Sequence, residues 1–172
     1  MAYIRIKDIF NNTGKTYTYA YLVQTTWRKR RPPKQKSLKY LGKLYTFPKI
    51  HNHPYCINHS LVLQDLYKDL LTLELLNHGF KKIKSNLYTN NNCYVDTQRF
   101  LFYNHQGKEI VLQLNSGFLC SHSIHTLLHH SLGNDRKAQK SLAKALALTG
   151  FSFTPEDFIT LHEYLTHESL NQ

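Results

Sequence analysis

The 172-residue sequence predicts an α+β fold: an N-terminal three-stranded antiparallel β-sheet with a basic hairpin loop, then a smaller sheet with helices and a helical C-terminus. Three observations lead to this prediction. Residues 2–41 alternate with the period of strands, leucines recur at three- and four-residue spacing after residue 60, and Ala- and Leu-rich segments with capping signals end the chain.

Two strands are predicted before residue 28. Residues 2–10 alternate between isoleucine and polar or aromatic residues, which is the pattern of a half-buried strand. The sequence Asn-Asn-Thr-Gly at 11–14 is typical of a turn. Tyr17, Tyr19, Tyr21 and Val23 then occupy alternate positions within residues 16–27, so we expect a second strand there, paired with the first in a hairpin.

A basic loop and a third strand complete the predicted sheet. Pro32 and Pro33 interrupt residues 28–34, and proline cannot donate to a central strand ladder, so we expect a loop there. Alternation resumes at residues 35–41 and predicts the third strand, which Gly42 is expected to end.

We expect two domains: residues 1–48 as a basic β-sheet module that binds nucleic acid, and residues 60–172 as a neutral α+β domain, with residues 49–59 as the connection. The neutral domain begins with a helix at 61–78, ended by Gly79, and continues with a meander of three or four strands within 83–114. Three helices follow: one capped by Ser121 or Ser123 and reaching about Leu132, one from Asp135 to Gly150, and one beginning at Thr154 and Pro155.

Net charge divides the chain at about residue 50. Residues 1–50 hold twelve Lys and Arg against the single acid Asp8, for +11, whereas residues 51–172 hold ten basic and ten acidic residues. Six of the twelve cations lie within residues 28–36, next to Trp27. Such a cluster repels itself unless water or a polyanion offsets the charge, and nucleic acid is the most common polyanion in a cell.

We therefore expect the basic module to bind nucleic acid. A β-hairpin fits the major groove of duplex DNA, and Arg can donate two parallel hydrogen bonds to phosphate or guanine. Trp27 and the tyrosines can stack on unpaired bases, although most of these aromatic residues are expected to be core or packing residues: Tyr17, Tyr19, Tyr21 and Trp27. The alternative for the charge cluster is a solvated loop that only favours solubility. The predicted contacts are Arg5, Lys7, Trp27, Arg28, Lys29, Arg30, Arg31, Lys34, Lys36, Lys39 and Lys43.

A family resemblance is carried by YIRIK at residues 3–7 and by GKTYTYAYLVQTTWRKRRPPKQKSLKYLG at residues 14–42. This segment resembles the N-terminal segment of certain insertion-sequence transposases with an acidic catalytic triad, which precedes the catalytic domain and helps bind transposon DNA. The resemblance implies DNA contacts at Arg28, Arg30, Arg31, Lys34, Lys36 and Lys39. It does not extend to the catalytic domain, because residues 51–172 contain no strand-borne cluster of acids suited to two metal ions.

The eleven histidines suggest a metal site or a small nuclease as further hypotheses. In the second of two groups, His125 and His129 lie on one helical face, although a polar helix face with neutral imidazoles explains them equally well, and we expect no metal. His162 and His167 are separated by five residues, so they cannot form the zinc-protease pair. The groups are His51, His53, Cys56 and His59, and Cys120, His122, His125, His129 and His130.

The sequence therefore favours a non-enzymatic protein that binds duplex DNA through the basic hairpin. Structured or ribosomal RNA is the alternative ligand, and a nuclease that uses the C-terminal His cluster is the third hypothesis. The neutral domain is expected to mediate partner or self association, for example as a homodimer, and no cofactor is expected. The chain shows no signal peptide and no apolar run long enough for a membrane span, so we expect a cytoplasmic, nucleoid-associated protein with reduced cysteines at Cys56, Cys93 and Cys120.

Overall fold

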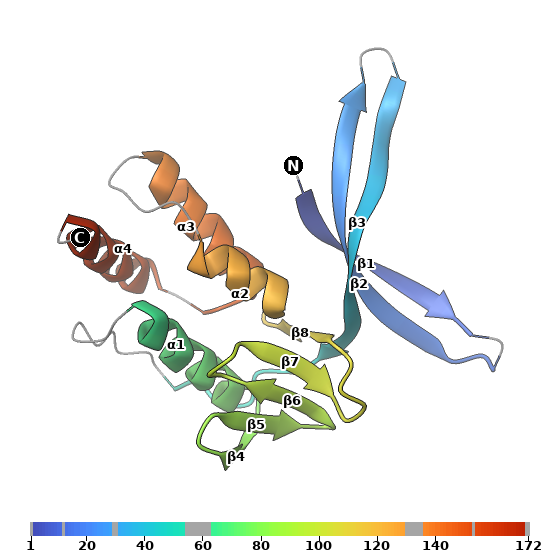
Figure 1. The fold of residues 1–172 in the computed structure, drawn as a ribbon, viewed down its shortest axis with the longest axis horizontal. Helices are drawn as coiled ribbons and strands as arrows, with labels where there is room; N and C mark the ends of the chain where they lie inside the picture. Colours follow the sequence, from blue (N-terminus) through green and yellow to red (C-terminus); the bar gives the residue numbers. More distant parts are fainter. Residues whose placement is uncertain are drawn as a thin grey trace.

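The computed structural model describes residues 2–11, 13–28, 31–53, 63–129, 136–152 and 154–170, which form the predicted α+β fold (Figure 1). The strands are β1 (Ala2–Phe10), β2 (Thr16–Arg28), β3 (Arg31–Thr46), β4 (Lys81–Lys84), β5 (Leu87–Asn90), β6 (Cys93–Asp96), β7 (Leu101–Asn104), β8 (Ile110–Leu114) and β9 (Gly117–Leu119). The helices are α1 (Leu63–Asn77), α2 (Ser121–Leu128), α3 (Arg136–Thr149) and α4 (Pro155–Leu170). None of these helices has the length and apolar composition that a membrane span requires.

A five-stranded sheet has the order β1-β2-β3-β8-β9 and contains the predicted N-terminal three-stranded antiparallel sheet. β3 continues it by pairing in parallel with β8, from Lys43 opposite Ile110 to Thr46 opposite Gln113. The sheet therefore takes strands from both predicted domains. The prediction of β8 as part of the meander was wrong. Four of its five residues are buried, because it is an interior strand between β3 and β9.

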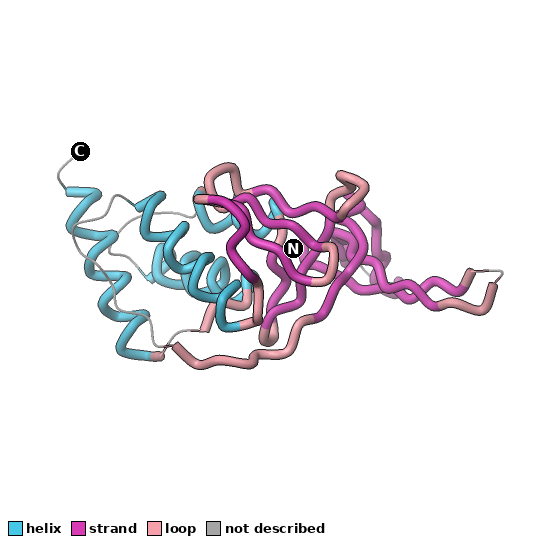
Figure 2. The backbone as a smooth tube through the Cα atoms, turned by 90° about the horizontal axis from the view of Figure 1, so that it is seen from below, coloured by secondary structure: helices cyan, strands magenta, loops and turns pink. Residues whose placement is uncertain are grey.

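The second sheet is antiparallel, with the order β4-β5-β6-β7. It packs with the helices around the larger core, to which α1 contributes Leu66, Tyr67, Leu70, Leu71 and Leu75. The sequence predicts that the buried leucines of this helix end at Leu76 or Leu75. Leu75 is buried and Leu76 is 39% exposed, and Tyr67 and Leu71 are buried as well. Figure 2 shows the helices gathered on one side of the molecule and the strands on the other.

A smaller core joins the N-terminal sheet to the rest of the protein. Ile4, Ala20, Leu41 and Leu44 pack there with Val111 of β8 and Cys120, which precedes α2. Leu22, Phe118 and Leu148 cover this cluster. These residues place one face of the N-terminal sheet against the body and leave the other face outward.

The described cysteines have the predicted character. Cys93 and Cys120 are free, buried thiols. Burial raises the pKa of Cys93 to about 11 and also raises that of Cys120. Both side chains therefore remain protonated thiols at neutral pH, while Cys56 lies outside the described residues.

The predicted loop at residues 28–34 is shorter than expected, because β3 already begins at Arg31. Arg28 pairs with Arg31 and Thr26 with Lys34, and the register shifts between these pairs. Pro32 and Pro33 fall at this irregularity, where neither occupies a paired position. A bulge in a two-stranded hairpin tolerates residues that lack an N–H, whereas a central strand does not.

The predicted end of the third strand at Gly42 was also wrong. Gly42 has φ +135° and a Cβ built there would lie 2.5 Å from the Glu109 carbonyl oxygen and 2.8 Å from the Ile110 Cα. The glycine therefore lets β3 approach β8 and continue to Thr46. Sequence reasoning treated the residue as a stop, although its role is close backbone contact.

The helix boundaries follow their capping residues. At α2 the cap is Cys120 and not Ser121 or Ser123: the Ser123 hydroxyl accepts from the Cys120 N–H at 2.9 Å and donates to its carbonyl at 3.0 Å. α2 ends at Leu128, and the expected positions Leu132 and Asp135 lie outside the described residues. At α4 the prediction is confirmed, since the Thr154 hydroxyl accepts from the Asp157 N–H and the Asp157 carboxylate accepts from the Thr154 N–H.

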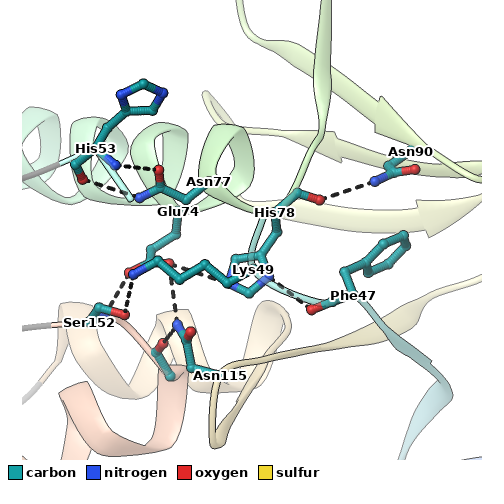
Figure 3. Close-up of polar contacts among 10 residues, drawn as sticks. Phe47, Lys49, His53, Glu74, Asn77, His78, Asn90, Asn115 and Ser152 are labelled. Carbon is teal, nitrogen blue, oxygen red and sulfur yellow. Dashed lines mark hydrogen bonds and ion pairs between the residues drawn. The ribbon is translucent and has the colours of Figure 1, made fainter. Parts of the chain in front are cut away.

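Glu74 of α1 forms a buried junction between distant segments (Figure 3). Its carboxylate accepts from the Ser152 N–H at 2.6 Å and from the Asn115 amide at 3.3 Å, and lies 3.6 Å from the His78 imidazole. His78 Nδ1 lies 2.8 Å from the Phe47 carbonyl oxygen. One carboxylate thus connects α1 with the β8–β9 turn and the segment after α3, beside a cavity of about 580 Å³.

Substitution of Glu74 by Gln should destabilise the protein, because the new NH₂ group faces donors where the carboxylate accepted. We expect a loss of about 1–3 kcal/mol in the free energy of unfolding, measured by urea denaturation. Asp69→Asn, at an exposed position of the same helix, is the matched control and should change little. Equal stability of the two variants would contradict the role of Glu74.

Substitution of Gly42 by Ala should cost about 3 kcal/mol or more, because a clash with β8 adds to the positive-φ strain. Gly107→Ala is the matched control: Gly107 has φ +72° but open space around the added methyl group, so only the strain of about 1 kcal/mol remains. Thermal unfolding of both variants checks this difference. If Gly42→Ala were no worse than Gly107→Ala, the close approach of β3 and β8 would be wrong.

Candidate nucleic-acid interface

β2 belongs to two hairpins that diverge from the body, one formed with β1 and one with β3 (Figure 1). The described β1 pairs reach only Gln24 of β2, and β8 pairs with β3 only from Lys43 onward. Residues 25–28 and 31–35 therefore form a two-stranded ribbon within the described structure. We call residues 22–28 and 31–39 the β2–β3 arm.

One face of the arm carries three predicted contact residues. Lys34, Lys36 and Lys39 lie opposite Thr26, Gln24 and Leu22, which alternate along one face of β2. All three lysines are exposed. Because Leu22 packs on the smaller core, this lysine face is the side of the sheet that also faces the body.

The opposite face combines cations with tyrosine rings. Lys7 Nζ lies 5.2 Å from the Tyr21 ring centroid, and Lys43 Nζ lies 4.5 Å from that of Tyr17. The Arg5 guanidinium donates a hydrogen bond to the side-chain amide oxygen of Gln35. Three of the predicted contacts, Arg5, Lys7 and Lys43, are therefore on this aromatic–cationic face, and each has a partner in the sheet.

Most tyrosines of β2 were expected to be core or packing residues, and the structure makes them packing residues on the surface of the sheet. Tyr17, Tyr19 and Tyr21 are half-buried and belong to neither core cluster. Tyr40 is 52% exposed and its ring centroid lies 5.4 Å from that of Tyr21 and 6.0 Å from that of Tyr19. Burial and the neighbouring tyrosines raise the pKa of Tyr40, so its phenol remains a hydrogen-bond donor.

Tyr40 and Gln35 were missed because strand bulges determine their positions. The register shifts between Ala20 and Tyr21, which brings Tyr40 and Lys43 to the same face although they are three residues apart. Simple alternation places them on opposite faces. The Gln35 amide also donates to the Tyr3 hydroxyl at 2.6 Å, and nothing in the sequence marks this contact.

The end of the arm presents Trp27, which is 80% exposed. Arg28 and Arg31 pair there through their backbones. The side chains of these two arginines, and all of Lys29 and Arg30, lie outside the described residues. The structure therefore brings six of the predicted contacts into two defined faces and places Trp27 at the end of the ribbon.

The histidine groups do not form a metal site in the described part of the chain, where no cluster of three or more suitable ligands occurs. His125 and His129 stack with ring centroids 4.0 Å apart, and the buried Cys120 thiol caps the helix. His51 and His53 lie in the coil after β3 with centroids 5.6 Å apart. Cys56, His59 and His130 lie outside the described residues.

The charge of Lys39 on the arm affects the pKa of His122 on α2. Burial, the nearby Lys39 and His125 lower its pKa below the usual 6.5. Its imidazole is therefore neutral at physiological pH. A phosphate placed next to Lys39 would oppose this shift.

His122 should make the protein less stable as the pH is lowered. Its pKa is lower in the folded state, so the unfolded chain takes up the proton first. Between about pH 7.5 and about pH 5.5, wild type should lose more in Tm than His122→Gln, since the unfolded imidazole titrates near 6.5. His105→Gln, at an exposed position of a turn, is the control and should follow wild type. Parallel Tm profiles for all three proteins would refute the assignment.

Comparisons with known proteins complete the description of this interface. No protein-family model, no curated protein and no solved structure matches the chain. The candidate interface is therefore described by its own geometry and charge: a sheet with a lysine face and an aromatic–cationic face, continued by a two-stranded ribbon with an exposed tryptophan near its end.

Proposed function

We propose that the protein binds nucleic acid through the β2–β3 arm and that duplex DNA is its ligand. The observation that carries the proposal is the geometry of the arm, an antiparallel hairpin that extends from the body, is two-stranded at residues 25–28 and 31–35, and exposes Lys34, Lys36 and Lys39 on one face. A ribbon of this kind fits the major groove, which is about 12 Å wide.

The charge of the arm supports a polyanionic ligand. Residues 22–39 contain seven cations and no acid. The single acid of the first 50 residues, Asp8, lies in the other hairpin, where it accepts a hydrogen bond from Thr18 at 2.7 Å. Because the arm has no internal counter-charge, release of condensed counterions from DNA favours binding there.

The lysines and the arginines of the arm suggest different roles. The lysines of the lysine face are compact point charges suited to phosphate oxygens. Arg28, Lys29, Arg30 and Arg31 follow one another in the sequence where β2 ends and β3 begins, and arginine suits the acceptor pair of a guanine edge in a major groove. In this arrangement the lysines position the ribbon and the arginines read sequence.

Structured or single-stranded RNA is the second candidate, and the exposed rings favour it. Trp27 at 80% and Tyr40 at 52% exposure offer ring faces to unpaired bases. Such stacking does not require a groove. Partner or self association through the remaining residues is a separate proposal, which binding by the arm does not require.

Neutralising the lysine face should weaken binding on every sequence. For Lys34→Gln/Lys36→Gln/Lys39→Gln we expect the slope of log K against log salt to fall in magnitude by about 2–3, at about 0.9 per phosphate contact. The control is Lys81→Gln/Lys82→Gln/Lys84→Gln, which removes the same charge from exposed positions of β4. Fluorescence polarisation with labelled duplex DNA gives both slopes. Equal effects of the two triple variants would show that only net charge matters.

Competition between polymers tests the ligand itself. Duplex DNA should displace the labelled probe at lower concentration than equal-length single-stranded DNA or hairpin RNA, because only the duplex offers a groove of the right width. Replacing Trp27 by Ala should then leave duplex affinity within about threefold, whereas loss of base stacking costs about 1–3 kcal/mol. Tighter binding of RNA with a large effect of Trp27→Ala would favour the second candidate.

A further inference from the structure

Helix α3 carries a second concentration of positive charge. Arg136, Lys137, Lys140 and Lys144 are all exposed, and the helix contains no acid. At 100° per residue these four side chains fall within an arc of about 100°. The opposite side of the helix is buried through Ala138, Leu142, Ala145, Leu146 and Thr149. We call the four cations the α3 stripe.

The α3 stripe carries much of the positive charge of its region. Residues 51–172 hold ten cations and ten acids, so without the four cations of α3 the rest of this region holds six cations against ten acids. Three of these six, Lys81, Lys82 and Lys84, lie at exposed positions of β4, in the other sheet. The β4 group therefore offers a control of similar charge at a different place in the fold.

The stripe lies on the same side of the N-terminal sheet as the lysine face of the arm. Leu148, one turn after Lys144, packs against the cluster that contains Ile4 of β1. Lys144 itself lines a groove of about 340 Å³ with Tyr3, Ile4 and Phe118. Ile4 pairs with Leu22, and Leu22 pairs with Lys39, so all three side chains share one face of the sheet.

We propose that the α3 stripe is a second phosphate-binding surface that contacts the same DNA duplex as the β2–β3 arm. This inference rests on the proposed function of the arm. The arm enters a groove, while the stripe meets the phosphate backbone as the duplex passes β1. Figure 1 shows α3 and the arm on either side of the N-terminal end of β1. Within α3, four exposed cations and no acid are available to a phosphate chain.

The test compares two triple variants that remove equal charge. Lys137→Gln/Lys140→Gln/Lys144→Gln neutralises the stripe, and Lys81→Gln/Lys82→Gln/Lys84→Gln is the control on β4. On a long duplex we expect the stripe variant to bind at least about tenfold more weakly at low salt, with a salt slope smaller by about 2–3. The control should remain close to wild type.

A series of duplex lengths distinguishes two surfaces from one. The difference between wild type and the stripe variant should shrink as the duplex shortens and disappear on duplexes that fill only the arm. Loss of affinity that is equal for both triple variants, or that does not depend on length, overturns the inference. If wild type binds but the stripe variant binds equally well, the stripe proposal alone is wrong, whereas a wild type that binds no duplex refutes the function of the arm.

Circular dichroism and the Tm check that the stripe variant is folded. Both should match wild type, because the three substituted lysines are exposed. If the triple variant does not fold, the single reversal Lys140→Glu serves the same purpose. It places an acid at the centre of the stripe and should weaken binding to long duplexes more than Lys82→Glu on β4.

Discussion

The parallel pairing of β3 with β8 is the constraint on which the rest of the structure depends. Four residue pairs, from Lys43–Ile110 to Thr46–Gln113, connect the N-terminal sheet to the body. The strand that makes these pairs is the same strand that continues outward into the arm. Because β3 is continuous through Gly42, the arm is an extension of the sheet itself.

This continuity explains how a charged ribbon is tolerated. An isolated two-stranded hairpin is at best marginally stable in water. Here the inner half of the ribbon is a sheet of three strands, and Ile4, Ala20 and Leu41 bury its base against Val111 and Cys120. The stability of the base thus supports the outer half, where six cations within residues 28–36 would otherwise favour separation of the strands.

The sequence allowed the α+β class, the three N-terminal strands and the α4 cap to be predicted, because alternation, turn residues and capping pairs are local signals. It did not allow the long-range features to be predicted. Gly42 resembles a strand end unless Glu109 is known to lie against it, and β8 resembles its meander neighbours unless β3 is known to pair with it. Likewise, the faces of Tyr40 and Lys43 depend on a register shift that alternation cannot reveal.

The two faces of the N-terminal sheet differ in what a phosphate would displace, and under the proposed function this difference favours one direction of approach. Lys7 and Lys43 already contact tyrosine rings, and each such contact is worth about 0.5–1 kcal/mol at an exposed site. Within the described part of the chain, Lys34, Lys36 and Lys39 have no ion pair or ring contact to lose. Approach from the lysine face therefore costs less, and it brings the polyanion to the side of the sheet where Lys39 lowers the pKa of His122. If the arm binds nucleic acid as proposed, a phosphate there would reduce the repulsion between Lys39 and a protonated His122, and binding would be coupled to proton uptake by α2.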